Sequence, residues 1–339
     1  MKNFSKSTKL LRVLFMTFFM LATVSIYASH FRYMTVNWEI ISTGPGGTVV
    51  EFNVTQSWRR SFYGAPNPGQ LVNVGTFQFG DGSISTLLIT VNNINTAEDF
   101  FVGNATFTHT YSGSSDVVAR FFSCCRISGL GPNSNDNYDM RTLITLSDPT
   151  NTSPVANTPP NLFIPVDQVN NIQLSAFDPN GDALFYAFPP SSESGLSQPI
   201  PTTPNGPATL SSSGLLTIDT NGVSVNTKFA TQVKISDSRG ASIPVDFIIQ
   251  TTGASNNPPQ FLFPPTPASG SVINVGQGNT TSFNLEAVDP DLGDTVNIFA
   301  TGLPSGSSFT ATPGNPANFN FSWTPTGADL GAFVIAFTA

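Results

Sequence analysis

The segment "TSFNLEAVDPDLGDTVNIFA", residues 281–300, decides the fold because it joins two strand-like runs through an acidic turn. Its first run alternates apolar and polar side chains with a period of two, which is typical of a β-strand with one buried face. The apolar face consists of Phe283, Leu285 and Ala287, and the polar face of Ser282, Asn284 and Glu286. The segment therefore predicts half-buried β-sheet next to a tight turn.

A counterpart of this segment, "NIQLSAFDPNGDALFYAF", occupies residues 171–188. Each copy follows a linker with a Pro-Pro pair, "NTPPNLFIP" before the first copy and "NNPPQFLFPP" before the second. Both copies then run through a strand, an acidic turn and another strand. A fixed order that recurs about 110 residues later is typical of tandem domains.

Upstream of this repeat, the chain alternates seven β-rich runs with turns between Ser29 and Thr150, a spacing that favours a β-sandwich. Only 10% of residues are charged, while Gly and Pro are abundant, which suits turn-rich β domains. The sequence thus predicts an all-β protein of tandem Ig-like β-sandwich domains. The expected divisions are a signal peptide, 1–28, and three domains, 29–150, 151–255 and 256–339.

The third domain is expected to lack its final strand. In the second domain the last strand is the run "IPVDFIIQ", residues 243–250, whereas the third domain has no run that corresponds to it. A sandwich edge that ends in unpaired apolar residues invites aggregation. We therefore expect further domains of the same polypeptide after Ala339.

The first 28 residues have the composition of an export signal. Four basic residues, the last of them Arg12, precede an apolar run from Val13 to Ile26, and "IYA" follows directly before Ser29. This pattern predicts a secretory signal peptide and hence a secreted or cell-surface protein. An uncleaved N-terminal membrane anchor is the alternative.

The charge distribution excludes one class of partner. Removal of the leader leaves nine basic residues against 21 acidic ones, so the mature chain is acidic. No Lys or Arg follows Arg239, and the last hundred residues therefore have no side chain that neutralises a phosphate. Nucleic-acid binding is not expected.

Two adjacent cysteines, Cys124 and Cys125, are the whole cysteine complement. Neighbouring Cα atoms lie about 3.8 Å apart across a trans peptide, and a bond between such residues needs a strained ring. We expect one buried thiol and one thiol near the surface, with a vicinal or an interchain disulfide as the alternatives. Two Cys and two His do not predict a zinc site.

Two motifs in the first domain carry a family resemblance. "FQFGDGS", residues 77–83, and "FTHTY", residues 107–111, resemble the signature of the polycystic-kidney-disease (PKD) type of Ig-like domain. Phe77 takes the place of the usual Trp, and Gln78 that of the first Asp. The resemblance implies a β-sandwich, and Gly80 suits the tight turn, so we interpret the motif as structural.

The second and third domains resemble bacterial putative-Ig and dystroglycan-type cadherin-like domains. The resemblance is carried in the third domain by "EAVDPDLGD", residues 286–294, and "FSWTPT", residues 321–326, and in the second by "AFDPNGD", residues 176–182. It implies a bacterial secreted or surface protein.

The acidic turns resemble the Ala-x-Asp-x-Asp-x-Gly calcium motif of cadherin repeats. This resemblance implies calcium ligands at Asp289, Asp291 and Asp294, and a weaker set at Asp178, Asn180 and Asp182. Ca²⁺ prefers six to eight oxygen ligands, which carboxylates and amides supply. A solvated turn is the alternative, because Asp, Pro, Asn and Gly are also the residues that a tight turn selects.

No catalytic motif is present. A nucleophile would need His30 or His109 beside an activated Ser or Cys, and no local pattern supports that arrangement. The sequence therefore predicts a non-catalytic extracellular adhesion or structural protein, with joints stiffened by calcium. Its expected partners are other surface proteins or extracellular glycans. The alternative is an accessory, carbohydrate- or protein-binding region of a larger secreted hydrolase.

Overall fold

The computed structural model describes most of the chain after the predicted leader. The described residues are 30–253, 259–268, 271–291, 293–301, 303–327, 329, 333 and 335–339. The expected signal peptide, 1–28, lies outside them, as do residues 254–258 of the second linker. Within the described ranges, no helix is long and apolar enough to cross a membrane.

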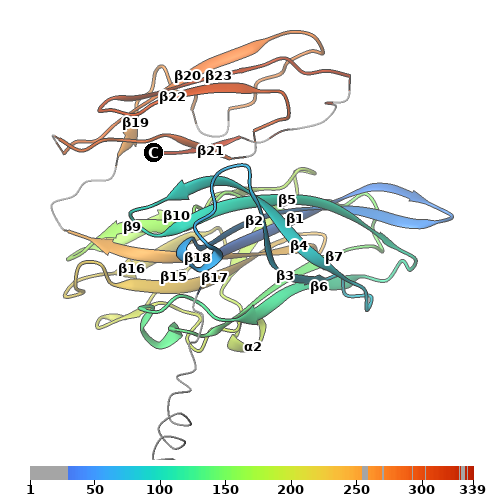
Figure 1. Ribbon diagram of the computed structural model, residues 1–339, viewed down its shortest axis with the longest axis horizontal. Coiled ribbons are helices and arrows are strands. Elements are labelled where there is room, and N and C mark those ends of the chain that lie inside the picture. The colour runs from blue at the N-terminus through green and yellow to red at the C-terminus, as the bar shows by residue number, and fades with distance from the viewer. Residues whose placement is uncertain are drawn as a thin grey trace, which may run out of the picture.

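Seven strands make up the first unit (Figure 1). They are β1 (Phe31–Gly44), β2 (Gly47–Arg59), β3 (Leu71–Gln78), β4 (Ile84–Asn95), β5 (Phe100–Tyr111), β6 (Val117–Cys124) and β7 (Asn137–Ile144). Burial alternates along β3 and along β4, as the period of two in their sequences predicts. Two short 3-10 helices, η1 (Ser61–Tyr63) and η2 (Gly131–Asn133), lie between strands.

The second unit contributes shorter strands and one helical turn, α2 (Ser191–Ser194). The strands are β8 (Val155–Ala156), β9 (Asn161–Pro165), β10 (Val169–Gln173), β11 (Ala176–Phe177), β12 (Leu184–Ala187), β13 (Thr202–Thr203), β14 (Gly206–Pro207), β15 (Thr209–Leu210), β16 (Leu215–Asp219), β17 (Lys228–Asp237) and β18 (Ser242–Thr252). Strands β9, β18, β17 and β12 form one layer, and β10, β16 and β15 form another.

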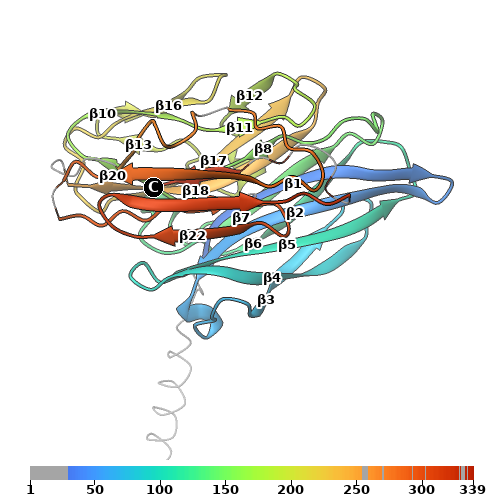
Figure 2. The ribbon, with the colours of Figure 1, turned by 90° about the horizontal axis from the view of Figure 1, so that it is seen from above.

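One strand of the second unit completes the sheet of the first. The order β1-β2-β5-β4-β3-β6-β7-β18 closes on itself because β18 also pairs with β1. Ser242 of β18 lies opposite Leu143 of β7, and Asp246 lies opposite Met34 of β1. The hydrogen-bonded sheet thus crosses the predicted boundary at 150/151 and wraps around the first core (Figure 2). Because β18 is covered from both sides, its sequence is almost continuously buried.

The described residues of the third unit form two sheets. Its strands are β19 (Gln260–Phe261), β20 (Thr281–Val288), β21 (Phe299–Thr301), β22 (Ser308–Thr312), β23 (Ala317–Trp323) and β24 (Ala336–Thr338). The order β19-β20-β23-β22 makes one sheet, and β21 pairs with β24 in the other. Phe283 lies opposite Phe321 in the β20–β23 pair, so the apolar face predicted for residues 281–288 faces the core.

Each unit has its own hydrophobic core. The first surrounds Trp38 and Trp58, the second Phe247, and the third Phe319. The prediction of an all-β protein built from tandem β-sandwich units is confirmed at this level, while the domain boundaries stay predictions. The segment between β7 and β8 packs against the first unit, because Ser153 is fully buried and its hydroxyl accepts a hydrogen bond from the backbone N–H of Trp38.

Candidate functional site

The acidic turn of the third unit brings its three aspartates together. One carboxylate oxygen from each of Asp289, Asp291 and Asp294 lies within 4.8 Å of the others. The backbone N–H of Asp291 donates to Asp289 Oδ1 at 2.8 Å, and the side chain of Asn315 hydrogen-bonds the backbone of Asp289 at 2.9 and 3.0 Å. These hydrogen bonds hold the turn in a conformation in which the carboxylate oxygens of the three aspartates lie close together. Oxygen atoms are the ligands that Ca²⁺ prefers.

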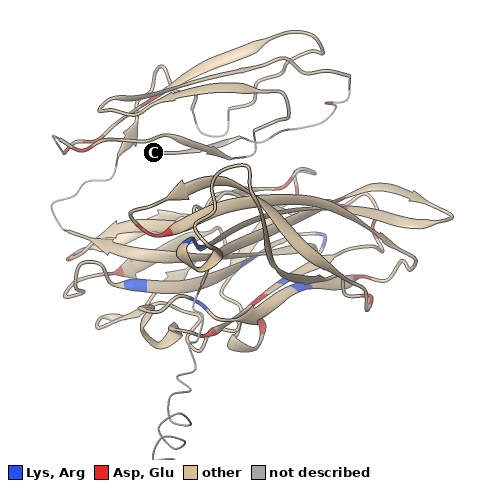
Figure 3. Ribbon diagram, viewed as in Figure 1, with Lys and Arg blue, Asp and Glu red and all other residues tan. Residues whose placement is uncertain are grey.

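No basic residue of the third unit neutralises this turn, since the chain has no Lys or Arg after Arg239. In Figure 3 this turn is red, the colour of Asp and Glu, and the described part of the unit has no blue, the colour of Lys and Arg. Asn256 and Asn257, in the linker before this unit, carry amide oxygens that could add to the site, but both lie outside the described residues. Cation binding by these three aspartates stays a prediction.

The equivalent turn of the second unit has a different charge partner. Asp178 Oδ1 accepts hydrogen bonds from the backbone N–H groups of Asn180 and Asp182 at 2.8 and 3.2 Å. Arg239 Nη1 lies 3.6 Å from Asp182 Oδ2, and the same guanidinium pairs with Asp148. Burial raises the pKa of Asp178 above its ordinary value. A guanidinium thus supplies positive charge here, and the predicted cation site stays a prediction.

The PKD-like motif forms a local hydrogen-bonded cluster. Asp81 accepts from the backbone N–H of Ser83 at 2.9 Å and contacts His109 Nε2 at 2.7 Å. The ring of His109 stacks on Phe79, and the Tyr111 hydroxyl donates to the Phe79 carbonyl at 2.8 Å. Burial raises the pKa of Asp81, but hydrogen bonds from Ser83 and His109 outweigh this effect and lower it to about 2.

This cluster does not have the geometry of a catalytic triad. The Ser83 hydroxyl, 3.3 Å away, and the Asp81 carboxylate both face the same ring nitrogen, Nε2 of His109. In a Ser-His-Asp triad the serine and the aspartate bond to different ring nitrogens, so that one proton is accepted while the other is held. The cluster links the turn between β3 and β4 to β5 through hydrogen bonds, and the structural interpretation of the motif stays a prediction.

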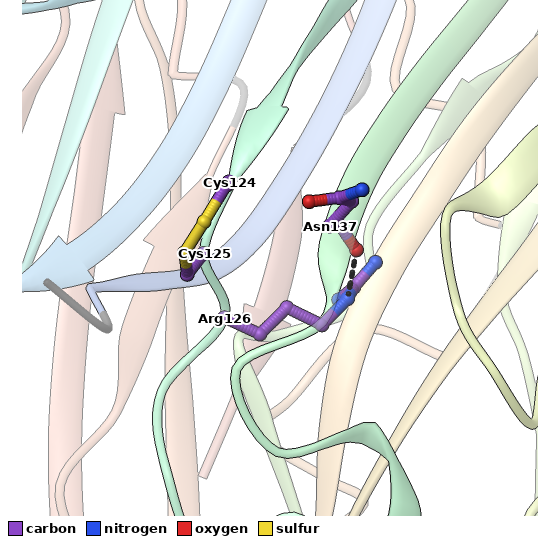
Figure 4. The surroundings of a disulfide bond; sticks show 4 residues. All are labelled: Cys124, Cys125, Arg126 and Asn137. Carbon is purple, nitrogen blue, oxygen red and sulfur yellow. Dashed lines mark hydrogen bonds between the residues drawn. A yellow bond between two sulfur atoms is a disulfide. The ribbon is translucent and has the colours of Figure 1, made fainter. Parts of the chain in front are cut away.

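Cys124 and Cys125 are joined by a disulfide at the end of β6 (Figure 4). The expectation of two free thiols is therefore wrong, and the vicinal disulfide that the sequence left as an alternative is present. Cys125 is 3% exposed, and its carbonyl accepts hydrogen bonds from the backbone N–H groups of His30 and Phe31. The disulfide thus adjoins the first residues of β1.

The next residue, Arg126, connects the first two units. Its guanidinium pairs with both carboxylate oxygens of Asp246 in β18 at 2.6 Å, and the two side chains are 1% and 0% exposed. Its Nε donates to the Asn137 carbonyl at 3.0 Å (Figure 4). Burial raises the pKa of Asp246, and the positive charge of Arg126 acts against that rise. Sequence reasoning missed this pair, because no local pattern joins residues 120 positions apart.

A cavity of about 760 Å³ lies between the second and third units. Its walls include Tyr186 from the second unit and Phe283, Trp323 and Phe333 from the third. This size and apolar lining fall within the range of small-molecule pockets. The aromatic side chains near the start of β1 pack in the interior, because Tyr33 and Trp38 are 3% and 1% exposed.

Comparison with known proteins relates the first unit to a family. Residues 32–147 match the family described as integrin beta-like protein A-E, N-terminal. Integrin beta-like protein C of Dictyostelium discoideum is 30% identical over 389 aligned positions, which cover 95% of this chain and 19% of the relative. Integrin beta-like protein A of the same organism is 27% identical, over 91% of this chain and 18% of its own length. The chain spans less than a fifth of the length of these relatives.

Solved structures are similar only at a coarse level. The titin I-band fragment I67–I69 has a TM-score of 0.20 and 10% identity, over 91% of this chain and 94% of the fragment. The human desmocollin-1 ectodomain has a TM-score of 0.21 and 11% identity, over 89% and 71%. The matched family is not the PKD or dystroglycan type, and these relatives give no support to a bacterial origin. The first unit of this chain is thus similar to the N-terminal region of the integrin beta-like proteins.

Proposed function

We propose that this chain is a non-catalytic, extracellular part of a cell-surface adhesion protein, with other surface proteins as partners. The observation that supports it is the match of residues 32–147 to the integrin beta-like N-terminal family, together with relatives of that name that align along 91% and 95% of the chain. The Asp81–His109 pair, whose geometry is not that of a catalytic triad, is consistent with this proposal.

Adhesion is tested with beads coated with the folded, leader-free chain. We expect these beads to attach to cells of the source organism more than beads coated with heat-unfolded chain do. Cells treated with protease should lose the attachment if the partner is a surface protein. Equal attachment of folded and unfolded chain, or no attachment of either, contradicts an adhesive role.

We further propose that Asp289, Asp291 and Asp294 bind Ca²⁺ and stiffen the third unit. The support is the convergence of their oxygen atoms and the lack of a basic residue in that unit. A ligand that binds the folded state stabilises it by about 2.7 kcal/mol at a hundredfold excess over Kd. Calcium in the millimolar range is therefore expected to raise the unfolding temperature of the third unit.

The variant Asp291→Asn tests this assignment, with Asp182→Asn in the second unit as its matched control. We expect Asp291→Asn to abolish the calcium-dependent rise and Asp182→Asn to leave it unchanged, since Arg239 already faces Asp182. A rise that survives Asp291→Asn, or no rise in the unmodified chain, would falsify the calcium proposal while leaving the adhesion assay intact.

A further inference from the structure

Five Asn-x-Ser/Thr tripeptides follow the predicted leader. They begin at Asn53, Asn104, Asn151, Asn279 and Asn320. Such tripeptides are acceptors for N-linked glycans in secreted proteins, provided that the folded chain leaves room for the sugar. The tripeptides are alike in sequence, but the fold gives their side chains different surroundings.

The first two tripeptides lie side by side on neighbouring strands. In the antiparallel pair of β2 and β5, Asn53 is opposite Thr106 and Thr55 is opposite Asn104. Each asparagine therefore faces the threonine of the other tripeptide, on the same face of the sheet. Figure 2 shows β2 and β5 next to one another. Diagonal neighbours of this kind lie about 7–8 Å apart, so two branched glycans would compete for the same space.

The side chains of these two asparagines differ in exposure and in bonding. Asn53 is half-buried, its Oδ1 accepts a hydrogen bond from Thr106 Oγ1 at 2.7 Å, and its Nδ2 contacts Glu51 Oε1 at 3.5 Å. Asn104 is exposed. A glycan on Asn53 Nδ2 would have to leave a half-buried position and displace the contact with Glu51, whereas one on Asn104 extends directly into solvent. The fold therefore favours Asn104.

Asn151 has no room for a sugar. Its side chain is 1% exposed, and Nδ2 donates to Thr145 Oγ1 at 3.2 Å and to Asp237 Oδ2 at 3.0 Å. A sugar on this nitrogen would replace one of its two hydrogens. Nδ2 could then no longer donate both to Thr145, just after β7, and to Asp237, at the end of β17. Glycosylation here is incompatible with the described fold.

The third unit offers two exposed acceptors. Asn279 precedes β20, and its side chain is exposed. Asn320 lies on the outer face of β23, opposite Asn284 of β20 and Thr310 of β22. Its side chain is also exposed, while its neighbour Phe321 faces the core. Both asparagines have solvent on the side from which a glycan would extend.

We propose that Asn104, Asn279 and Asn320 carry N-linked oligosaccharides, and that Asn53 and Asn151 stay unmodified. The donor is a lipid-diphosphate-linked oligosaccharide of the secretory pathway. A C–N bond forms between the asparagine Nδ2 and the anomeric carbon, and the C–O bond to the lipid diphosphate breaks. The lipid diphosphate leaves with the bonding electron pair, and Nδ2 loses one proton.

The experiment is site-resolved mass spectrometry of the full 339-residue chain expressed in eukaryotic secretory cells. Peptide N-glycosidase converts each glycan-bearing Asn to Asp and leaves unmodified Asn unchanged. We expect Asp at positions 104, 279 and 320, and Asn at positions 53 and 151. Unconverted Asn104 in folded protein, or conversion of Asn151 in folded protein, overturns the proposal. This measurement uses the unaltered chain, so it does not depend on the folding of any variant.

A matched pair of substitutions separates the two neighbouring acceptors. Asn104→Gln is expected to raise the electrophoretic mobility by the equivalent of one glycan, and Asn53→Gln to leave it unchanged. Thr106→Ser keeps the tripeptide and is expected to retain the glycan. The reverse result, with mobility changed by Asn53→Gln alone, contradicts the assignment.

Discussion

Gly80, in the turn between β3 and β4, lies against a neighbouring strand. Its φ is +88°, and a Cβ there would come within 2.8 Å of the carbonyl carbon of Val118. Gly82 has a similar φ of +94° but open space around the position of a Cβ. The two glycines of one motif therefore have different constraints, which the sequence does not distinguish.

Substitution of these glycines by alanine is expected to give unequal losses of stability. Gly82→Ala should cost about 1–2 kcal/mol, the penalty for a left-handed backbone with a side chain. Gly80→Ala should cost more than that, because the backbone of β6 must also move. Urea unfolding of both variants checks the order, and equal losses would show that the contact with Val118 is unimportant.

Asp81 gives the stability a predictable dependence on acid pH. Its pKa is about 2 in the folded chain and 3.8 ordinarily, so the ionised carboxylate stabilises the folded state above about pH 4. This contribution is lost as the pH falls through the folded value of about 2. In urea unfolding at several pH values, Asp81→Asn should be less stable than the unmodified chain near pH 5, and the gap should close toward pH 2. A difference in stability between the two proteins that does not change with pH argues against this role of the Asp81 carboxylate.

Arg126 and Asp246 should be interdependent. Arg126→Ala leaves a buried carboxylate without its charge partner, and breaking such a pair costs about 3–5 kcal/mol. The double variant Arg126→Met/Asp246→Leu removes both charges and should cost less than Arg126→Ala alone. Denaturant unfolding of the three proteins measures the coupling. Additive losses in the double variant would contradict a direct ion pair.

At the scale of elements, the disulfide at the end of β6 joins two residues that are consecutive in the sequence. In the chain-entropy model a bond stabilises according to the length of the loop it closes, and for adjacent residues this gives about 1 kcal/mol. Cys124→Ser/Cys125→Ser should therefore lower the stability only slightly. Thermal unfolding of the variant and of the reduced protein checks this, and a loss of several kcal/mol would assign the disulfide a larger role at the start of β1.

The strands themselves were predictable to a large extent. The seven β-rich runs between Ser29 and Thr150 correspond to β1 through β7, and the alternation in residues 281–288 corresponds to β20. The turn after β20 also brings the three predicted aspartates together. These features are local, because alternation and turn composition act over a few residues. The pairing partners of β18 were not predictable, because its sequence, with apolar residues on both sides of Asp246, does not indicate which strands lie beside it.

At the scale of the whole molecule, the first two units depend on each other. Strand β18 closes the sheet around the first core, and Ala241 belongs to that core while Tyr33 of β1 belongs to the second. A fragment of residues 30–150 loses β18 and exposes the edges of β1 and β7. Unpaired edges of this kind favour aggregation.

We therefore expect residues 30–150 alone to be unfolded or aggregated, and residues 30–253 to unfold cooperatively. Circular dichroism and size-exclusion chromatography of the two fragments distinguish these outcomes. A monomeric, cooperatively folded 30–150 fragment would show that the β18 pairing is dispensable, and would make 150/151 a true domain boundary.

The sequence alone determines the all-β class, the order of three units and the acidic turns, because each of these depends on neighbours within a few residues along the chain. Only the tertiary structure decides that β18 completes the first sheet, that Arg126 meets Asp246, and which asparagines face solvent. Those facts depend on contacts between residues about a hundred positions apart. Such contacts are selected by the packing of whole sheets, and no short pattern encodes them.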